Sequence, residues 1–232
     1  MALSTGLFMA AVMYVLYMAL EPYVRRHWPQ TIISWSRLLS GKVRDPLIGR
    51  DVLFGVLLGT SWIVTYMVGF VFRQRAGNSP QFGGTEFLLG TRQLLGSWST
   101  NVMGSVLGTL MFFLVLVLLR VLLRNRWLAA IGFVILYTAP KVLSADYPWL
   151  VLPVWVVIYG IAAFAVVRFG VVSLAIGILM ANLLLNLPYT SDFSMWFAAH
   201  ALFSVLVFAA LAGWGAYTSM AGGQLWKEDP FA

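Results

Sequence analysis

Long apolar runs alternate with short polar stretches along the whole chain. The runs cover residues 4–20, 52–72, 102–119, 127–145, 147–167, 169–187 and 193–218. Most of them approach the ~20 residues that a helix needs to cross a hydrocarbon core ~30 Å thick. The pattern predicts an all-α fold, a polytopic membrane helix bundle of about seven transmembrane helices in a single integral membrane domain spanning residues 1–232. Six spans would result if the first or the fourth run did not cross.

Two polar segments between the runs also have helical spacing. In residues 28–40 the apolar side chains of Trp28, Ile32, Trp35 and Leu39 recur at intervals of three or four, and Gly41 follows as a stop signal. Residues 86–98 show the same kind of spacing. We therefore expect two short amphipathic helices in the membrane interface. Each is either an ordinary connector or a surface that binds lipid or a partner.

Composition excludes a soluble domain. Hydrophobic residues make up 61% of the chain and charged residues only 10%, which is too few to cover a soluble protein of this size. The net charge of +7 comes from basic clusters beside apolar runs, so we expect a lipid bilayer as the partner and no nucleic acid. Without cysteine and with only two histidines, the chain is expected to hold no metal and no cofactor.

The polar stretch from Glu21 to Asp51 separates the first two runs and carries the main topological signals. It contains six of the fifteen Lys and Arg residues. Asp51 is expected to cap the span that starts at Val52, and the pairs at 44–45 and 50–51 are expected to neutralise each other. The residues predicted to set the interface and the orientation are Arg25, Arg26, Trp28, Trp35, Arg37, Arg44, Asp45, Arg50 and Asp51.

The distribution of basic residues predicts the orientation. If the N-terminus lies outside, eleven basic residues fall in cytoplasmic segments: Arg25, Arg26, Arg37, Lys42, Arg44, Arg50, Arg120, Arg124, Arg126, Arg168 and Lys227. Four fall outside: Arg73, Arg75, Arg92 and Lys141. Because cytoplasmic loops are enriched in Lys and Arg, we expect an external N-terminus and a cytoplasmic C-terminus.

A resemblance adds to this interpretation. The stretch from Leu16 through Gly59 contains the segments EPYVRRHWP and ISWSRLLSGKVRDPLIGRD. It resembles the multi-span membrane tail that follows the catalytic domain in some bacterial membrane Ser/Thr protein kinases, particularly those of Acidobacteria-like bacteria. The stretch AGGQLWKEDPFA is similar to the polar end of such tails. The resemblance implies a bacterial inner-membrane module that normally occurs together with a kinase. The glycine-rich loop, strand lysine, HRD and DFG motifs are missing from this sequence, so it cannot itself be that kinase.

Small and polar residues inside the runs suggest how the helices associate. Two GxxxG patterns, Gly55 with Gly59 and Gly104 with Gly108, predict close helix contacts. The candidate cofactor or ligand residues are Asn182, Asn186 and His200. Asn182 and His200 are expected at similar depth on neighbouring helices, where they form either a hydrogen bond that holds the two helices or a small polar pocket with His200 as an axial ligand. We predict the hydrogen bond.

These features favour a protein without catalysis of its own. No acidic residue lies centrally in a run, which disfavours an ion-coupled transporter, and no catalytic residue set is evident. The first hypothesis is a scaffold, anchor or subunit of a membrane complex, with other membrane proteins as partners. The second is a membrane sensor that works with a separate Ser/Thr kinase. The third is a small-molecule transporter.

Overall fold

The structure is a computed structural model, and it describes residues 2–77, 90–186, 192, 194–195 and 198–221. Within these residues every regular element is helical, which confirms the predicted all-α class. The elements are α1 (Ala2–His27), η1 (Pro29–Thr31), α2 (Ile33–Leu39), α3 (Pro46–Arg75), α4 (Thr91–Leu123), α5 (Arg126–Leu143), α6 (Pro148–Arg168), α7 (Val171–Asn186) and α8 (Ala198–Ala221).

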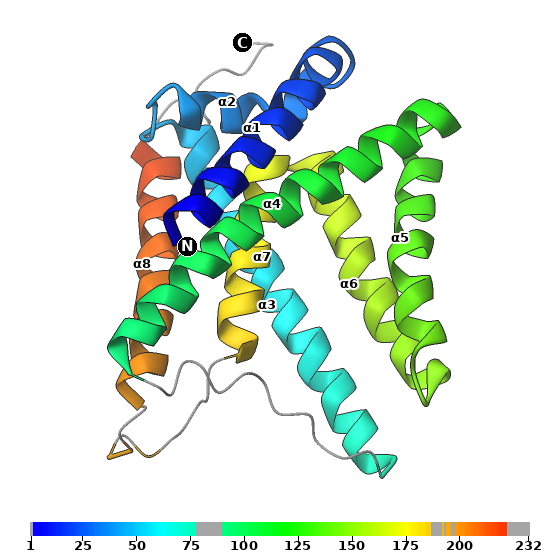
Figure 1. The fold of residues 1–232 in the computed structure, drawn as a ribbon, viewed down its shortest axis with the longest axis vertical. Helices are drawn as coiled ribbons and strands as arrows, with labels where there is room; N and C mark the ends of the chain where they lie inside the picture. The colour runs from blue at the N-terminus through cyan, green and yellow to red at the C-terminus, as the bar shows by residue number, and fades with distance from the viewer. Residues whose placement is uncertain (1, 78–89, 187–191, 193, 196–197, 222–232) are drawn as a thin grey trace, which may run out of the picture.

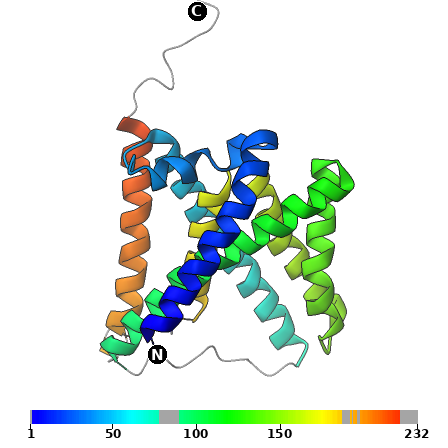
Figure 2. The ribbon, with the colours of Figure 1, turned by 45° about the horizontal axis from the view of Figure 1, so that its top comes forward.

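The helices form a polytopic membrane bundle. In the described part of the chain, six helices are long and apolar enough to cross a membrane, whereas the apolar helix α7 has only 16 residues. At 1.5 Å per residue, α7 is about 24 Å long, shorter than a typical hydrocarbon core. Figure 2 shows the helix ends gathered at two opposite levels, and α1 and α3 to α8 run alternately between them. The seven predicted apolar runs therefore correspond to seven helices.

The expected interfacial helix at residues 86–98 does not exist as a separate element. Residues 91–98 are the first turns of α4, which continues without a break for 33 residues; residues 86–89 lie outside the described part. The hydroxyl of Ser99 and the amide of Asn101 donate to carbonyls four residues earlier, at 3.0 and 2.8 Å, so these polar side chains do not interrupt the helix. With a length of about 50 Å, α4 crosses the bundle diagonally (Figure 1).

The other expected interfacial helix is present but divided. Residues 28–40 contain the 3₁₀ turn η1 and the short helix α2, and Gly41 ends the segment with a φ of +78°. Trp28 and Ile32 are buried, whereas Leu39 is 61% exposed. The first residues of this segment therefore pack into the bundle, whereas its last residues are exposed.

The prediction that Asp51 caps a helix beginning at Val52 is wrong. Helix α3 begins at Pro46, and the side chain of Asp45 accepts a hydrogen bond from the Leu47 amide at 2.9 Å. An aspartate followed by a proline is the better start, because proline has no amide hydrogen to satisfy and its φ already suits the first helical turn. Asp51 is consequently inside the helix, where its side chain is free to contact other elements.

Helix α7 lies at the centre of the bundle and packs chiefly against α3 and α4. Asp51, Gly55 and Gly59 recur every four residues and form a stripe on the α7 side of α3. A Cβ atom at Gly55 would lie 2.6 Å from the Ile176 Cβ, and one at Gly59 would lie 2.8 Å from the Met180 Cβ. The two helices therefore approach too closely for any side chain at these glycines.

The second glycine pair has a different environment. No atom lies within 4 Å of the place where a Cβ would be at Gly104 or Gly108. These two glycines of α4 therefore make no close helix contact with the described part of this chain.

Adding one methyl group should distinguish the two pairs. We expect Gly55→Ala to lower the free energy of unfolding by about 1–3 kcal/mol, because the new methyl group overlaps α7. Gly104→Ala is the matched control and should be neutral or stabilising by up to about 1 kcal/mol, since alanine is the better helix former. The measurement is thermal unfolding in a mild detergent. Equal stability of the two variants would contradict the close α3–α7 contact.

Candidate functional site

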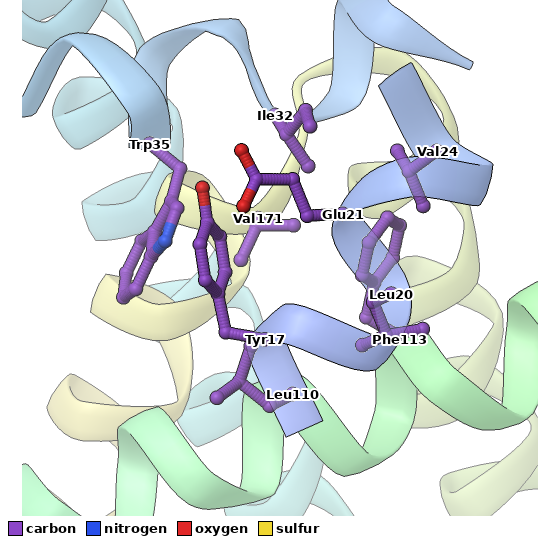
Figure 3. A pocket seen from close by; sticks show the side chains of 9 residues that line it. All are labelled: Tyr17, Leu20, Glu21, Val24, Ile32, Trp35, Leu110, Phe113 and Val171. Atoms are coloured by element: carbon purple, nitrogen blue, oxygen red, sulfur yellow. The ribbon is translucent and has the colours of Figure 1, made fainter. Parts of the chain in front are cut away.

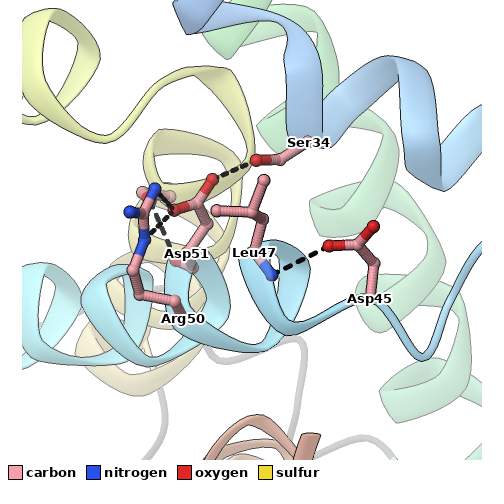
Figure 4. A network of polar contacts seen from close by, with 6 residues as sticks. Ser34, Asp45, Leu47, Arg50 and Asp51 are labelled. Atoms are coloured by element: carbon pink, nitrogen blue, oxygen red, sulfur yellow. Dashed lines mark hydrogen bonds and ion pairs between the residues drawn. The ribbon is translucent and has the colours of Figure 1, made fainter. Parts of the chain in front are cut away.

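A buried carboxylate joins the interfacial segment to the bundle. Asp51 is only 1% exposed, and Ser34 of α2 donates a hydrogen bond to its Oδ2. The Nε and Nη2 atoms of Arg50 donate to Oδ1 at 3.1 and 3.0 Å. Figure 4 shows the Arg50 and Ser34 side chains reaching Asp51 from opposite sides. The carboxylate is thus paired with a cation and a hydroxyl, the condition under which burial of a charge is tolerated.

The central helix is attached at the same place. The hydroxyl of Ser173 in α7 donates to the backbone carbonyl of Asp51 at 2.8 Å, and Ser173 itself is fully buried. Residues from α2, α3 and α7 therefore meet at Asp51, and we call this arrangement the Asp51 junction.

A second ion pair links the same elements at the surface. Arg37 of α2 contacts Asp45 with a distance of 2.6 Å between Nη1 and Oδ2. Of the two Arg-Asp pairs expected to neutralise each other, Arg50 and Asp51 form an ion pair at 3.0 Å, whereas Asp45 pairs with Arg37. Arg44 is exposed. The segment before α3 is therefore held by the Ser34–Asp51 hydrogen bond and by the Arg37–Asp45 ion pair.

Helix α1 meets the interfacial segment around a small cavity. Figure 3 shows Tyr17, Glu21 and Trp35 among the side chains that line it. The cavity measures only about 10 Å³. The Trp35 indole nitrogen is buried and meets no acceptor among the described residues, while Glu21 forms an ion pair with Arg25 at 2.6 Å. Polar groups of α1 and α2 therefore meet here within a largely apolar contact.

The other predicted interface residues lie at the same end of the bundle. Arg25 and Arg26 are exposed at the end of α1. Trp28 is buried, and the guanidinium carbon of Arg120 lies 4.0 Å from its ring centroid, close enough for a cation–π interaction. We call this end of the bundle, where α1 and α4 end and α3 and α5 begin, the basic face.

A second candidate site lies within the span region. A cavity of about 300 Å³ is formed by α3, α4, α6 and α7. Its lining includes the aromatic residues Trp62, Tyr66, Phe112, Trp155 and Tyr159 together with Gly104, Gly108 and Asn182. The Trp62 indole donates to the Ile158 carbonyl at 2.8 Å, which holds one wall in place. We call this space the aromatic cavity.

The described residues include only part of the polar set that the sequence singled out. Asn182 lines the aromatic cavity, and the side-chain amide of Asn186 donates to the backbone carbonyl of Asn182 at 2.6 Å. The side chain of His200 lies outside the described part. Helix α8 packs chiefly along α3 and touches α7 much less. The expected hydrogen bond between Asn182 and His200 therefore stays a prediction.

Among the described residues, no group of three or more His, Asp and Glu side chains is arranged to hold a metal ion. Sequence reasoning missed Ser34 and Ser173, the two hydroxyls of the Asp51 junction. The available signal was the four-residue spacing of Asp51, Gly55 and Gly59, which places the carboxylate on the stripe that faces another helix.

The Asp51 junction predicts a large effect from a nearly isosteric change. In Asp51→Asn, an amide donor replaces one acceptor oxygen and faces either the Ser34 hydroxyl or the Arg50 guanidinium. We expect a loss of about 1–3 kcal/mol in the free energy of unfolding, since a buried donor loses its acceptor. The exposed Asp146 supplies the control, Asp146→Asn, which should be neutral. Thermal unfolding in detergent measures both, and a neutral Asp51→Asn would refute the junction.

Comparisons with protein-family models, with curated proteins and with solved structures found no match for this chain. The resemblance to kinase membrane tails therefore stays a prediction. The features of the molecule that bear on its function are the Asp51 junction, the basic face and the aromatic cavity.

Proposed function

We propose that the protein is a non-catalytic module of the bacterial inner membrane that anchors partner proteins at its basic face. The observation that carries this proposal is the Asp51 junction. In it, the Ser34 hydroxyl and the buried Asp51 carboxylate fix α2 on α3, and the Ser173 hydroxyl fixes α7 on α3. A segment held in this way presents its outer side chains in a constant arrangement, which lowers the entropy lost when a partner binds.

The exposed part of this segment has the composition of a protein contact surface. Leu39 and Val43 are 61% and 48% exposed, and Lys42 and Arg44 beside them are also exposed. Apolar side chains rimmed by positive charge suit a partner with apolar and acidic residues. The resemblance to kinase tails suggests a protein that carries a Ser/Thr kinase domain as this partner.

Charge supports a cytoplasmic location of the basic face. The described residues at this face include ten with basic side chains: Arg25, Arg26, Arg37, Lys42, Arg44, Arg50, Arg120, Arg124, Arg126 and Arg168. The opposite face has four: Arg73, Arg75, Arg92 and Lys141. The positive-inside rule then favours an external N-terminus and a cytoplasmic C-terminus.

Two single cysteines test both parts of the proposal. The chain has no cysteine, and Ser40 and Ser144 are both exposed residues that follow a helix, on the basic face and on the opposite face. We expect a membrane-impermeant maleimide to label Ser144→Cys in intact cells and Ser40→Cys only in inverted vesicles. A photoreactive crosslinker attached at Ser40→Cys should capture a defined partner, and the same reagent at Ser144→Cys should not.

A charge change supplies the specificity control. Lys42→Glu together with Arg44→Glu should abolish the crosslink from Ser40→Cys without lowering thermal stability, because both side chains are exposed. Labelling of both cysteines from one side would overturn the orientation. A crosslink that survives the charge reversal would overturn the proposed surface.

The aromatic cavity favours a second candidate function, a membrane sensor of a lipophilic ligand. A volume of about 300 Å³ lies at the lower end for small-molecule sites, and aromatic walls with a single amide at Asn182 are typical of them. Its position between α3, α4, α6 and α7 would allow a ligand to change how these helices pack. A separate kinase that contacts the basic face would then respond to this change in helix packing.

Filling the cavity tests this candidate. Gly108→Leu places a side chain in the cavity, whereas Gly96→Leu adds the same side chain at an exposed position on the same helix outside it. We expect native mass spectrometry of the protein from its host membrane to show a bound small molecule in the wild type and in Gly96→Leu, and none in Gly108→Leu. An empty wild type, or equal occupancy in all three proteins, would contradict a sensor role for this cavity.

A further inference from the structure

A second cavity of about 300 Å³ opens on the basic face, and it combines charged side chains with aromatic ones. It lies between η1, the beginning of α5 and the end of α6. Its polar side chains are those of Gln30, Thr31, Arg126 and Arg168, and its apolar walls include Trp28, Trp127 and Phe164. No carboxylate of the described residues lines it. We call it the arginine cavity.

The fold itself brings the two arginines together. Arg126 is the first residue of α5 and Arg168 is the last residue of α6. These two helices pack against each other as antiparallel neighbours, so the beginning of one lies beside the end of the other. Residues far apart in sequence thus place two guanidinium groups at one cavity.

The wall that η1 provides is fixed by close backbone contact. Gly170 has a φ of +95°, and a Cβ atom there would lie 2.5 Å from the Thr31 carbonyl oxygen. Only glycine allows the turn after α6 to approach η1 so closely. Trp28, which also lines the cavity, stacks against Arg120, and one buried nitrogen of Arg120 meets no acceptor in the described part of the chain. The cavity is therefore bounded by positions that have little freedom to move.

Charge is unbalanced at this site. Among the described residues, the ion pairs join Arg25 to Glu21, Arg37 to Asp45 and Arg50 to Asp51. Arg126 and Arg168 take part in none of them, and Arg126 only lies 5.6 Å from the Trp127 ring centroid. Two guanidinium groups that share a cavity without a carboxylate repel each other, and an anion would relieve this repulsion. Guanidinium is the group best suited to bind a phosphate with two hydrogen bonds.

We propose that the arginine cavity binds the phosphate group of an anionic phospholipid. Free phosphate would satisfy the same guanidinium groups, but the aromatic walls favour a lipid. Tryptophan is enriched at the headgroup level of membranes, and Trp127 and Phe164 are 55% and 51% exposed beside the arginines. The phosphate then contacts Arg126 and Arg168, Gln30 donates to the headgroup, and the acyl chains lie along the aromatic side chains.

Lipid titration tests the proposal. Purified protein in a non-ionic detergent is titrated with phosphatidylglycerol, phosphatidylcholine or inorganic phosphate, and native mass spectrometry measures the bound fraction. We expect phosphatidylglycerol to bind tightly, phosphatidylcholine weakly and inorganic phosphate weakly. The double variant Arg126→Gln, Arg168→Gln should bind phosphatidylglycerol about 25-fold more weakly, since each basic residue near an anionic surface contributes roughly a factor of five.

The control variant also removes two positive charges from the basic face. Lys42→Gln with Arg44→Gln lies outside the cavity and should leave phosphatidylglycerol binding within about twofold of the wild type. An equal loss in both double variants would show diffuse attraction and overturn the site. Inorganic phosphate that binds as tightly as the lipid would overturn the lipid as ligand.

A measurement on the wild type does not depend on the folding of any variant. A phosphatidylglycerol with a photoreactive group near the headgroup should attach to peptides that contain Gln30 or Trp127. Attachment only to peptides from the opposite face, such as the one containing Ser144, would contradict the proposal.

Discussion

Close contact between α3 and α7 is the constraint on which the rest of the bundle depends. Lipid chains are as apolar as leucine, so helices in a membrane gain little from burying apolar side chains and associate mainly by close packing and hydrogen bonds. The stripe of Asp51, Gly55 and Gly59 provides both. At its glycines the backbone of α3 approaches Ile176 and Met180, and at its first position the Asp51 carbonyl accepts a hydrogen bond from Ser173. Around this pair, α4 packs against α7, α8 packs against α3, and α6 supplies much of the main buried cluster.

The position of Asp51 at the end of this stripe explains how a polar segment is fixed to an apolar bundle. Its backbone carbonyl accepts a hydrogen bond from Ser173 of α7. Its side chain accepts hydrogen bonds from Ser34 of α2 and from the adjacent Arg50. One residue thus connects the packing of the span region to the arrangement of the basic face. Helix η1 is fixed separately, by the close approach of Gly170 to Thr31.

The sequence predicts which segments are helical. It predicts less well where the helices end and which of them make contact. Apolar runs identify all seven helices because hydrophobicity is a property of each segment by itself. The continuity of α4 through Ser99 and Asn101 was missed, since hydropathy does not show that these side chains bond carbonyls four residues earlier. The Asp51 junction was also missed, because its hydroxyls lie 17 and 122 positions away in the chain. The arginine cavity likewise requires the pairing of α5 with α6.

The two glycine pairs show why a motif alone does not define a contact. Both have the GxxxG spacing, and both present a flat helix surface. On α3 this surface meets α7, whereas on α4 it borders the aromatic cavity. The difference lies in the neighbouring helix: α7 approaches the first pair so closely that a Cβ atom would overlap Ile176 or Met180, whereas no described neighbour lies within 4 Å of a Cβ at the second pair. The spacing thus identifies a flat surface, and the path of the neighbouring helix decides whether that surface is covered or borders open space.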